Sequence, residues 1–133
     1  MSVRIVRRPD DTTKAMIEKD EKYFRQVVEP LAVHVAQHFS LDLKSVEHKK
    51  FGRPSDESLV LGLCYPNQKR IRVLIRPFYN GKFCERLKEE LIIRTVAHEL
   101  AHLRHADHSK AHTDFTEEIF NFIWHRKDGN EKS

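Results

Sequence analysis

The feature that most constrains the fold of this 133-residue chain is a hydrophobic repeat that changes its period twice. Up to about Phe39, apolar residues recur every three or four positions, which predicts an α-helix with one apolar face. From Val46 to Pro77, apolar and polar residues alternate, which predicts β-strands. Helical patterns return from about Phe83 to His105, and again from a start between Ser109 and Asp114. This order predicts a small α+β domain with an N-terminal helix, an antiparallel three-stranded sheet and two C-terminal helices.

Residues with special backbone preferences mark the boundaries of these elements. Asp10 and Asp11 can cap the first helix, and Pro30 should kink or split it. The turn residues from Tyr65 to Lys69 predict a hairpin between two strands. The segment from Val46 to Phe51 can add the third strand to the sheet.

The composition excludes several classes of protein. Hydrophobic residues make up 39% of the chain and charged residues 33%, with 4 Gly and 5 Pro, which is unlike a disordered or collagen-like sequence. Apolar runs such as Leu59 to Tyr65 are far shorter than the roughly 18–20 residues that a membrane span needs. We expect residues 1–133 to form a single domain without a membrane partner, with flexible ends at 1–10 and 127–133.

The N-terminus and the cysteines bear on where the protein works. The first residues lack the long apolar core of a signal peptide. The two cysteines, Cys64 and Cys84, make no disulfide framework and fit a reducing compartment. We therefore expect an intracellular protein, either cytoplasmic or nuclear, and a monomer.

The run His98-Glu99-Leu100-Ala101-His102 is an HExxH motif inside the strongest helical pattern of the chain. On a helix the two histidines lie about 40° apart on one face. Val96, Leu100 and Leu103 lie on the opposite face, where they can enter the core. Two imidazoles one turn apart can bind one Zn²⁺, and Glu99 can reach a water on that ion without ligating it. The motif thus predicts a hydrolytic zinc site.

A catalytic zinc ion usually has three protein ligands and an open fourth position, so a third ligand is needed. A straight helix carries His105 too far along its axis to meet the first two histidines at one ion. His108 can reach the ion if the helix ends near His105 and the chain folds back. We predict His98, His102 and His108 as the metal ligands. The alternative third ligands are Asp107, His112, Glu117 and Glu118.

The stretch from Thr95 to His108 reads TVAHELAHLRHADH and is followed by Ser-Lys-Ala. It resembles the HExxHx5H signature of the SprT-like, WLM and YgjP-type zinc metallopeptidases. The layout of a helix followed by a hairpin also resembles the minimal zincin core that these families share. The resemblance implies intracellular peptidase activity, with Glu99 as the catalytic acid/base and with the three predicted histidines as zinc ligands. In the SprT-like and WLM branches, it further implies proteolysis of proteins crosslinked to DNA.

The sequence departs from related signatures at two points, and these departures bear on which family it resembles. The metzincins share the ligand spacing but have Gly three residues after the second histidine, where this chain has His105, and they need a downstream Met-turn. The only methionines here are Met1 and Met16, so the chain is not a metzincin. The related families tend to have an aromatic residue four positions after the third histidine, where this chain has His112.

Three arginines, Arg70, Arg72 and Arg76, have the spacing to share one face of a predicted strand. With a net charge of +4 and a sequence pI near 9.1, such a face could contact the phosphates of DNA. The alternative is a solvated strand face whose charges keep the chain soluble and discourage edge pairing.

Together these features predict a zinc-dependent endopeptidase that hydrolyses peptide bonds with a metal-activated water, possible substrates being DNA-associated or DNA-crosslinked proteins. The substrate is expected to lie extended along a sheet edge. The candidates for the residue that stabilises the oxyanion are His105, His112 and Tyr79. The alternative function is a non-enzymatic zinc-stabilised module that binds nucleic acid or protein. A site closed by Asp107 as a fourth ligand would favour that alternative.

Overall fold

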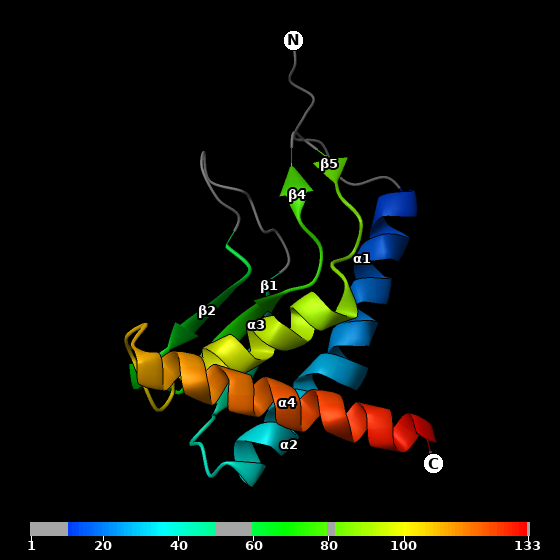
Figure 1. The fold of residues 1–133 in the computed structure, drawn as a ribbon. Helices are drawn as coiled ribbons and strands as arrows, with labels where there is room; N and C mark the ends of the chain where they lie inside the picture. The colour runs from blue at the N-terminus through cyan, green and yellow to red at the C-terminus, as the bar shows by residue number, and fades with distance from the viewer. Residues whose placement is uncertain (1–10, 50–59, 80–81, 133) are drawn as a thin grey trace.

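The computed structural model describes residues 11–49, 60–79 and 82–132 (Figure 1). The N-terminal helical region comprises α1 (Asp11–Tyr23), the π-helical turn η2 (Phe24–Val28) and α2 (Glu29–His38). The strands are β1 (Ser45–Lys49), β2 (Gly62–Tyr65), β3 (Arg70–Leu74), β4 (Phe78–Tyr79) and β5 (Lys82–Phe83), with the 3-10 helix η3 (Pro66–Gln68) between β2 and β3. The C-terminal helices are α3 (Glu89–Ala101) and α4 (Lys110–Lys132). The predicted α+β architecture is confirmed.

The N-terminal helical region is interrupted where the sequence predicts an interruption. The backbone N–H of Glu29 donates to the carbonyl oxygen of Phe24, five residues earlier, so a π-type turn precedes Pro30. Proline has no N–H, and its ring crowds the carbonyl four residues before it, so a wider turn fits its position. Pro30 therefore splits the region into α1 and α2 without ending it.

The main sheet has the strand order β1-β3-β2 and is mixed rather than antiparallel. The hairpin around Pro66–Gln68 places β2 antiparallel to β3, as predicted. The prediction is wrong for β1, which runs parallel to β3, with Val46 opposite Ile71. A two-strand hairpin fixes the antiparallel direction, but β1 is joined to β3 through residues 50–69, which is long enough for a parallel pair.

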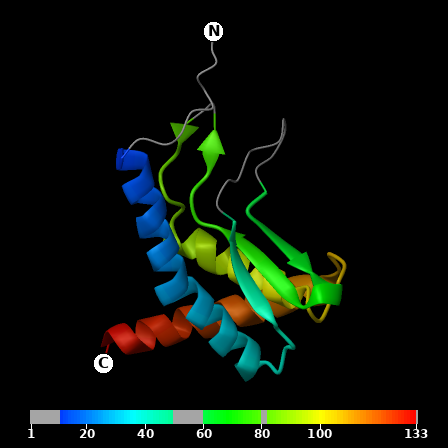
Figure 2. The ribbon, with the colours of Figure 1, turned by 180° about the vertical axis from the view of Figure 1, so that it is seen from behind.

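The core lies between the sheet and the helices on one of its faces. Helix α3 packs on β2 and β3, and α4 packs on α3 (Figure 1). Seen from behind, the sheet lies in front of α3 and α4 (Figure 2). The fully buried side chains come from all of these layers and include Val35, Ile71, Val73, Val96, Leu100 and Ile119. Helix α3 is therefore the central element, and the HExxH motif lies at its C-terminal end.

The bounds of α3 differ from the prediction at both ends. The predicted start near Phe83 is wrong, because β5 pairs with β4 and the N–H of Leu87 donates to the carbonyl of Ile75 at 2.8 Å. This tertiary pairing overrides local helix propensity. The helix ends at Ala101 rather than near His105. Helix α4 begins within the predicted range and continues through Lys132, into the segment predicted to be flexible. The flexibility of 1–10 and 127–133 stays a prediction.

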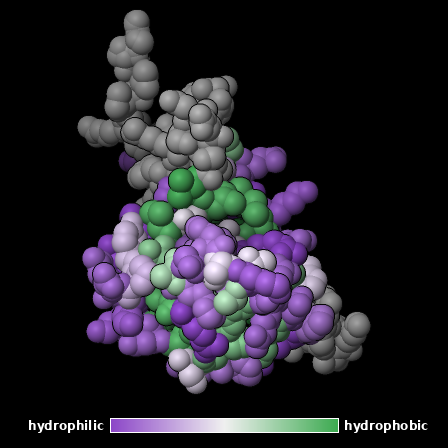
Figure 3. Space-filling model, turned by 60° about the vertical axis from the view of Figure 1, so that its left-hand side comes forward, coloured by the Kyte–Doolittle hydropathy of each residue, from purple (hydrophilic) through white to green (hydrophobic). Residues whose placement is uncertain are grey.

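The surface shown in Figure 3 is largely hydrophilic, with hydrophobic residues gathered next to the grey atoms. Within the described ranges, no helix combines the length and the apolar character needed to cross a membrane. Cys64 and Cys84 are both free thiols, as the sequence predicts.

Candidate metal centre

Three histidine side chains converge where α3 ends and α4 begins. The Nε2 atoms of His98 and His102 are 3.2 Å apart, and those of His102 and His108 are also 3.2 Å apart. The Nε2 atoms of His98 and His108 are 3.3 Å apart and close the triangle. Zinc–nitrogen bonds of about 2.0–2.1 Å at a tetrahedral ion place two ligand atoms about 3.3–3.4 Å apart. The spacing of these nitrogens therefore fits one small tetrahedral metal ion.

A fourth histidine, His112, lies beside the triangle. Ligand nitrogens of His98, His102 and His112 lie within 4.8 Å of one another, so this cluster also could hold a metal ion. The His112 ring stacks on that of His102, with centroids 4.0 Å apart and planes inclined by 20°. Its Nε2–H donates to the carbonyl oxygen of His98 at 3.1 Å, which leaves only its Nδ1 for a metal.

The turn after α3 explains why residues far along the helix axis can meet. The N–H groups of Leu103 and Arg104 donate to carbonyls three residues earlier, which tightens the end of the helix. The chain then folds back, so that the carbonyl of His105 accepts a hydrogen bond from Nδ1 of His102 at 3.1 Å. The guanidinium of Arg104 donates to the carbonyl of Phe39 at 2.6 Å and anchors this turn to the end of α2.

The hydrogen bond from Nδ1 of His102 has a chemical consequence. It places the ring proton on Nδ1 and leaves the Nε2 lone pair directed into the triangle. Burial and the neighbouring histidines lower the pKa of His98 to about 4, and burial lowers the pKa of His102. Both rings are therefore neutral at pH 7, which is the state that binds a metal.

Glu99 is a buried carboxylate, 6% exposed, beside this cluster. No cation among the described residues pairs with it, and burial raises its pKa to about 7. A Cβ atom at Gly62 would lie 3.0 Å from both Cγ and Oε2 of Glu99, so the bare backbone of β2 passes directly over this side chain. Burial, followed by the Glu99 charge, raises the pKa of the Cys64 thiol to about 11, so this thiol is protonated.

Of the alternative ligands, only His112 belongs to a cluster with His98 and His102 among the described residues. Asp107 is exposed, and His105, an oxyanion candidate, contacts the Phe115 ring with centroids 5.9 Å apart. Glu117 is ion-paired with Arg94 at 3.2 Å. Glu118 lines another pocket, of about 490 Å³, between α2 and α4. The Tyr79 side chain, a predicted oxyanion candidate, lies outside the part of the chain whose side chains are described.

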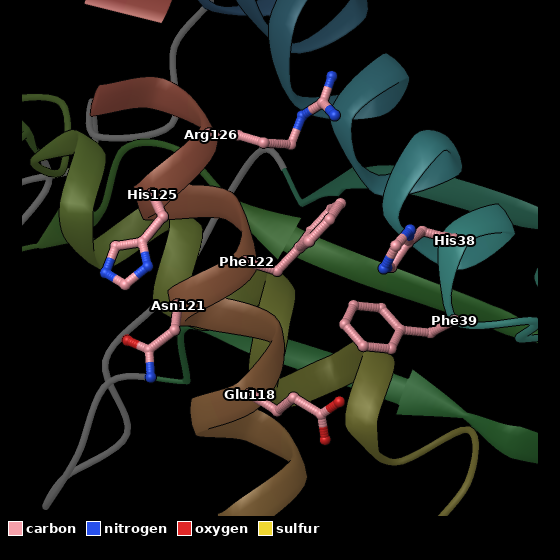
Figure 4. A pocket seen from close by; sticks show the side chains of 7 residues that line it. All are labelled: His38, Phe39, Glu118, Asn121, Phe122, His125 and Arg126. Carbon is pink, nitrogen blue, oxygen red and sulfur yellow. The ribbon is translucent and has the colours of Figure 1, made fainter. Parts of the chain in front are cut away.

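That other pocket is built mainly from stacked rings. Figure 4 shows Phe122 of α4 directed toward His38 and Phe39 at the end of α2. The His38 and Phe122 rings stack with centroids 4.0 Å apart, and Phe39 meets Phe122 edge-on at 5.5 Å. The rings thus pack α2 against α4. None of the residues that line this pocket belongs to the histidine cluster of the metal centre.

The three predicted phosphate-binding arginines do not share one strand face. Arg70 and Arg72 lie on β3, and both contact the Glu47 carboxylate of β1, at 2.8 and 3.3 Å. The prediction is wrong for Arg76, which lies beyond the end of β3. Its guanidinium makes two hydrogen bonds to the buried Asp20 carboxylate of α1, at 2.7 and 3.1 Å. Sequence spacing missed this because β3 ends at Leu74, before the alternation would reach Arg76.

Gly62 is the residue at the site that sequence reasoning missed. Its position inside an alternating strand pattern was the available signal, because glycine there often marks a close approach of the backbone to another group. The identity of that group depends on how α3 packs against β2, which local sequence does not specify.

Comparison of this chain with known protein families, with curated proteins and with solved structures finds no match. The geometry by itself establishes a cluster of three histidines that could hold a metal ion. The identity of the ion and the chemistry performed there are matters for the proposal that follows.

Proposed function

We propose that this chain is a zinc-dependent endopeptidase whose zinc ion is held by His98, His102 and His108. The observation that carries the proposal is the triangle of Nε2 atoms, 3.2–3.3 Å apart, with the buried Glu99 carboxylate next in sequence to His98. The resemblance to the SprT-like, WLM and YgjP-type signature supports the same ligands and the same role for Glu99.

The residues of the chain suggest how hydrolysis would proceed. Zinc bound there supplies the Lewis acidity that lowers the pKa of a water and polarises the scissile carbonyl. Glu99 takes a proton from the attacking water and later delivers it to the leaving amine, so no covalent enzyme intermediate is needed. The histidines stay neutral throughout and act only as ligands.

The edge of the sheet suggests where a substrate would lie. In the described part of the chain, β2 pairs with β3 alone, so its other edge offers backbone N–H and C=O groups. An extended peptide can add to such an edge as a further strand. Because Gly62 of β2 lies against Glu99, a peptide on this edge would pass beside the proposed general base.

The proposal is tested by measuring bound metal and proteolysis together. Purified protein should contain one zinc ion per chain and should cleave an unfolded protein substrate. A chelator should abolish cleavage, and zinc should restore it. Bound zinc without cleavage of any unfolded protein would refute the peptidase assignment, and absence of zinc after reconstitution would refute the site.

A second candidate function is a zinc-stabilised binding module without catalysis. It is favoured by His112, which belongs to a cluster with His98 and His102 whose ligand nitrogens all lie within 4.8 Å of one another. The absorption spectrum of the cobalt-substituted protein distinguishes the two. An added inhibitor anion or hydroxamate changes the spectrum of an open site and leaves that of a closed four-ligand site unchanged.

Action on DNA-associated proteins, an intracellular location and a monomeric state stay predictions. Support for DNA contact comes from the net charge of +4 and from Arg70 and Arg72 on one strand face. Glu47 lies between these two arginines and partly neutralises them. Any DNA contact through this face is therefore expected to be weak and sensitive to salt.

A further inference from the structure

A cavity of about 370 Å³ opens between β2 and α3, next to the candidate metal centre. His98 and Glu99 line it on the side of the metal centre, and Gly62 and Thr95 line it beside Glu99. The rest of its lining comes from Val60, Leu61, Leu91 and Arg94. Its volume lies near the lower end of the range of about 300–1,000 Å³ for ligand pockets. The cavity therefore has room for a side chain or two, and not for a large cofactor.

The apolar lining of this cavity is unusual for the surface of the chain. Within the described ranges, the exposed large hydrophobic residues are Val27, Val33, Val60 and Leu91. Single exposed apolar side chains are ordinary on protein surfaces. Two of these four, Val60 and Leu91, however, line the same cavity, 39% and 37% exposed respectively. Apolar surface is thus left open to solvent where a substrate of the proposed reaction would pass.

The polar groups of the cavity are already engaged. The Arg94 guanidinium is ion-paired with Glu90 at 3.4 Å and with Glu117 at 3.2 Å, and it lies 3.9 Å from the centre of the Phe120 ring. Its charge is therefore compensated and does not select an acidic side chain. The Thr95 hydroxyl donates to the carbonyl of Leu91 at 2.9 Å. Among the side chains of the cavity, apart from the proposed catalytic groups, what remains available to a ligand is hydrocarbon.

We propose that this cavity binds one large apolar side chain of the substrate, next to the peptide bond that is cut. The inference rests on the proposed function and gives it a substrate class, namely unfolded segments with an aliphatic or aromatic residue at that position. Side chains of an extended peptide alternate between two faces, so a strand added to β2 directs every second side chain toward α3. The space beside the Gly62 Cα is filled by Thr95 and Glu99, so such a residue would enter the cavity where Val60 and Leu91 line it.

The test compares peptides that differ at one position beside the cleavage site, which carries Leu, Phe, Ser, Asp or Lys. Burial of one large apolar side chain contributes about 1.5–3 kcal/mol, which corresponds to roughly 10- to 150-fold in kcat/KM. We expect the zinc-loaded chain to cleave the Leu and Phe peptides faster than the Ser peptide by such a factor. Leu91→Lys should remove this preference and raise the relative rate for Asp. Val33→Lys, at a valine of α2 that is 41% exposed and outside this cavity, is the matched control.

A second variant and a binding measurement keep the inference testable. Val60→Ser should weaken the same preference if Leu91→Lys fails to fold. Binding of the same peptides to the Glu99→Gln variant should follow the same order and should lose it with Leu91→Lys. Cleavage without side-chain preference, or with a preference that both cavity variants leave intact, would overturn this inference and leave the proposed function standing. If no peptide is cleaved, the proposed function is wrong, and equal binding of the Leu and Ser peptides would overturn the cavity as well.

Discussion

Two buried carboxylates, Asp20 and Glu99, have similar exposure and opposite electrostatics. Asp20 is 4% exposed and accepts hydrogen bonds from Arg76 and Arg86 at 2.7–3.2 Å. Burial raises its pKa, but the hydrogen bonds and charges of the two arginines outweigh burial, so the net pKa is lowered. Glu99 is 6% exposed and has no such partner among the described residues, so burial raises its pKa to about 7.

The difference teaches that burial of an acid does not by itself indicate a reactive group. Asp20 ties α1 to the segment after β3 and to Arg86, and it stays ionised. Its negative charge is compensated by the two arginines that it contacts, Arg76 and Arg86. Glu99 has no cationic partner among the described residues, and buried groups with a perturbed pKa are typical of functional sites.

The largest effect is expected from the exchange of each acid for its amide. Glu99→Gln should lower kcat by about 10²- to 10⁴-fold and leave bound zinc unchanged, because in the proposed mechanism Glu99 moves a proton without holding the metal. Asp20→Asn should leave kcat of the folded protein within about twofold. Cleavage rates and zinc content of both variants provide the measurement. Full activity of Glu99→Gln would remove the proposed mechanism.

The next largest effect concerns the third ligand. His108→Ala should reduce zinc affinity by more than the 10- to 100-fold that is typical of groups that only orient a ligand. His112→Phe keeps a ring that can stack on His102 but removes the hydrogen bond to the His98 carbonyl, so its loss should lie within about 10- to 100-fold. Competition with a fluorescent zinc chelator measures both. A greater loss for His112→Phe would reassign the third ligand.

The pH dependence of the free energy of unfolding should distinguish Asp20 from Glu99. The folded pKa of Asp20 is lowered, so its contribution is present above its ordinary value of about 3.8 and is lost as pH falls through the folded pKa. The folded pKa of Glu99 is raised from 4.5 to about 7, so the metal-free fold binds more protons there than the unfolded chain, and the contribution of Glu99 to stability falls as pH rises across that window. The lowered pKa of His98, about 4, contributes with the opposite sign, so the Glu99 contribution is read from the difference between the parent chain and Glu99→Gln. Urea unfolding at several pH values should show that Asp20→Asn flattens the acidic limb and that the stability of the parent chain relative to Glu99→Gln falls between about pH 4.5 and 7.

At fixed neutral pH, Asp20→Asn should also lower the free energy of unfolding by about 2–4 kcal/mol, because it leaves Arg76 and Arg86 without their shared charge. Asp20→Ala in the same assay controls for the residual hydrogen bonds of the amide. An unchanged urea midpoint for both variants would show that the ion pairs do not hold α1 in place.

A smaller effect is expected where β2 passes over Glu99. In Gly62→Ala, the new Cβ would lie 2.6 Å from Cγ2 of Thr95 and 3.0 Å from Oε2 of Glu99. We expect about a tenfold loss of kcat with zinc retained. Thr95→Ser removes the methyl contact and keeps the hydroxyl, so the double variant should recover stability and keep the loss of kcat. Recovery of both would show that Gly62 matters for packing alone.

The smallest effect is expected from the arginines of β3. Glu47 already contacts Arg70 and Arg72, so we expect these arginines to bind DNA weakly and only at low salt. Reversal of the charges of Arg70 and Arg72 should abolish this binding, together with any acceleration of cleavage by DNA. Cleavage of a free peptide should not change, since neither arginine lines the cavity beside Glu99. Titration of single- and double-stranded DNA at two salt concentrations measures this. Absence of binding at low salt would remove DNA from the proposal.

The helical spacing of the motif was sufficient to predict that His98 and His102 share a face and that His108 could reach them after a turn. These are local properties, since they depend on 100° per residue and on a short loop. The paired arginines were not predictable in the same way. Arg76 and Asp20 are 56 residues apart in the chain, and their contact depends on how α1 packs beside the end of β3.

Local sequence patterns were thus sufficient to predict the helices, the hairpin, the interruption at Pro30 and the histidines that can meet, because each follows from the backbone geometry of a short segment. Tertiary structure alone decided that β1 runs parallel to β3, that β5 replaces the first turns of the predicted helix, and that Gly62 lies over Glu99. It also decided which buried acid has a cationic partner. These features depend on contacts between segments distant in the chain, and the same local patterns are compatible with several such packings.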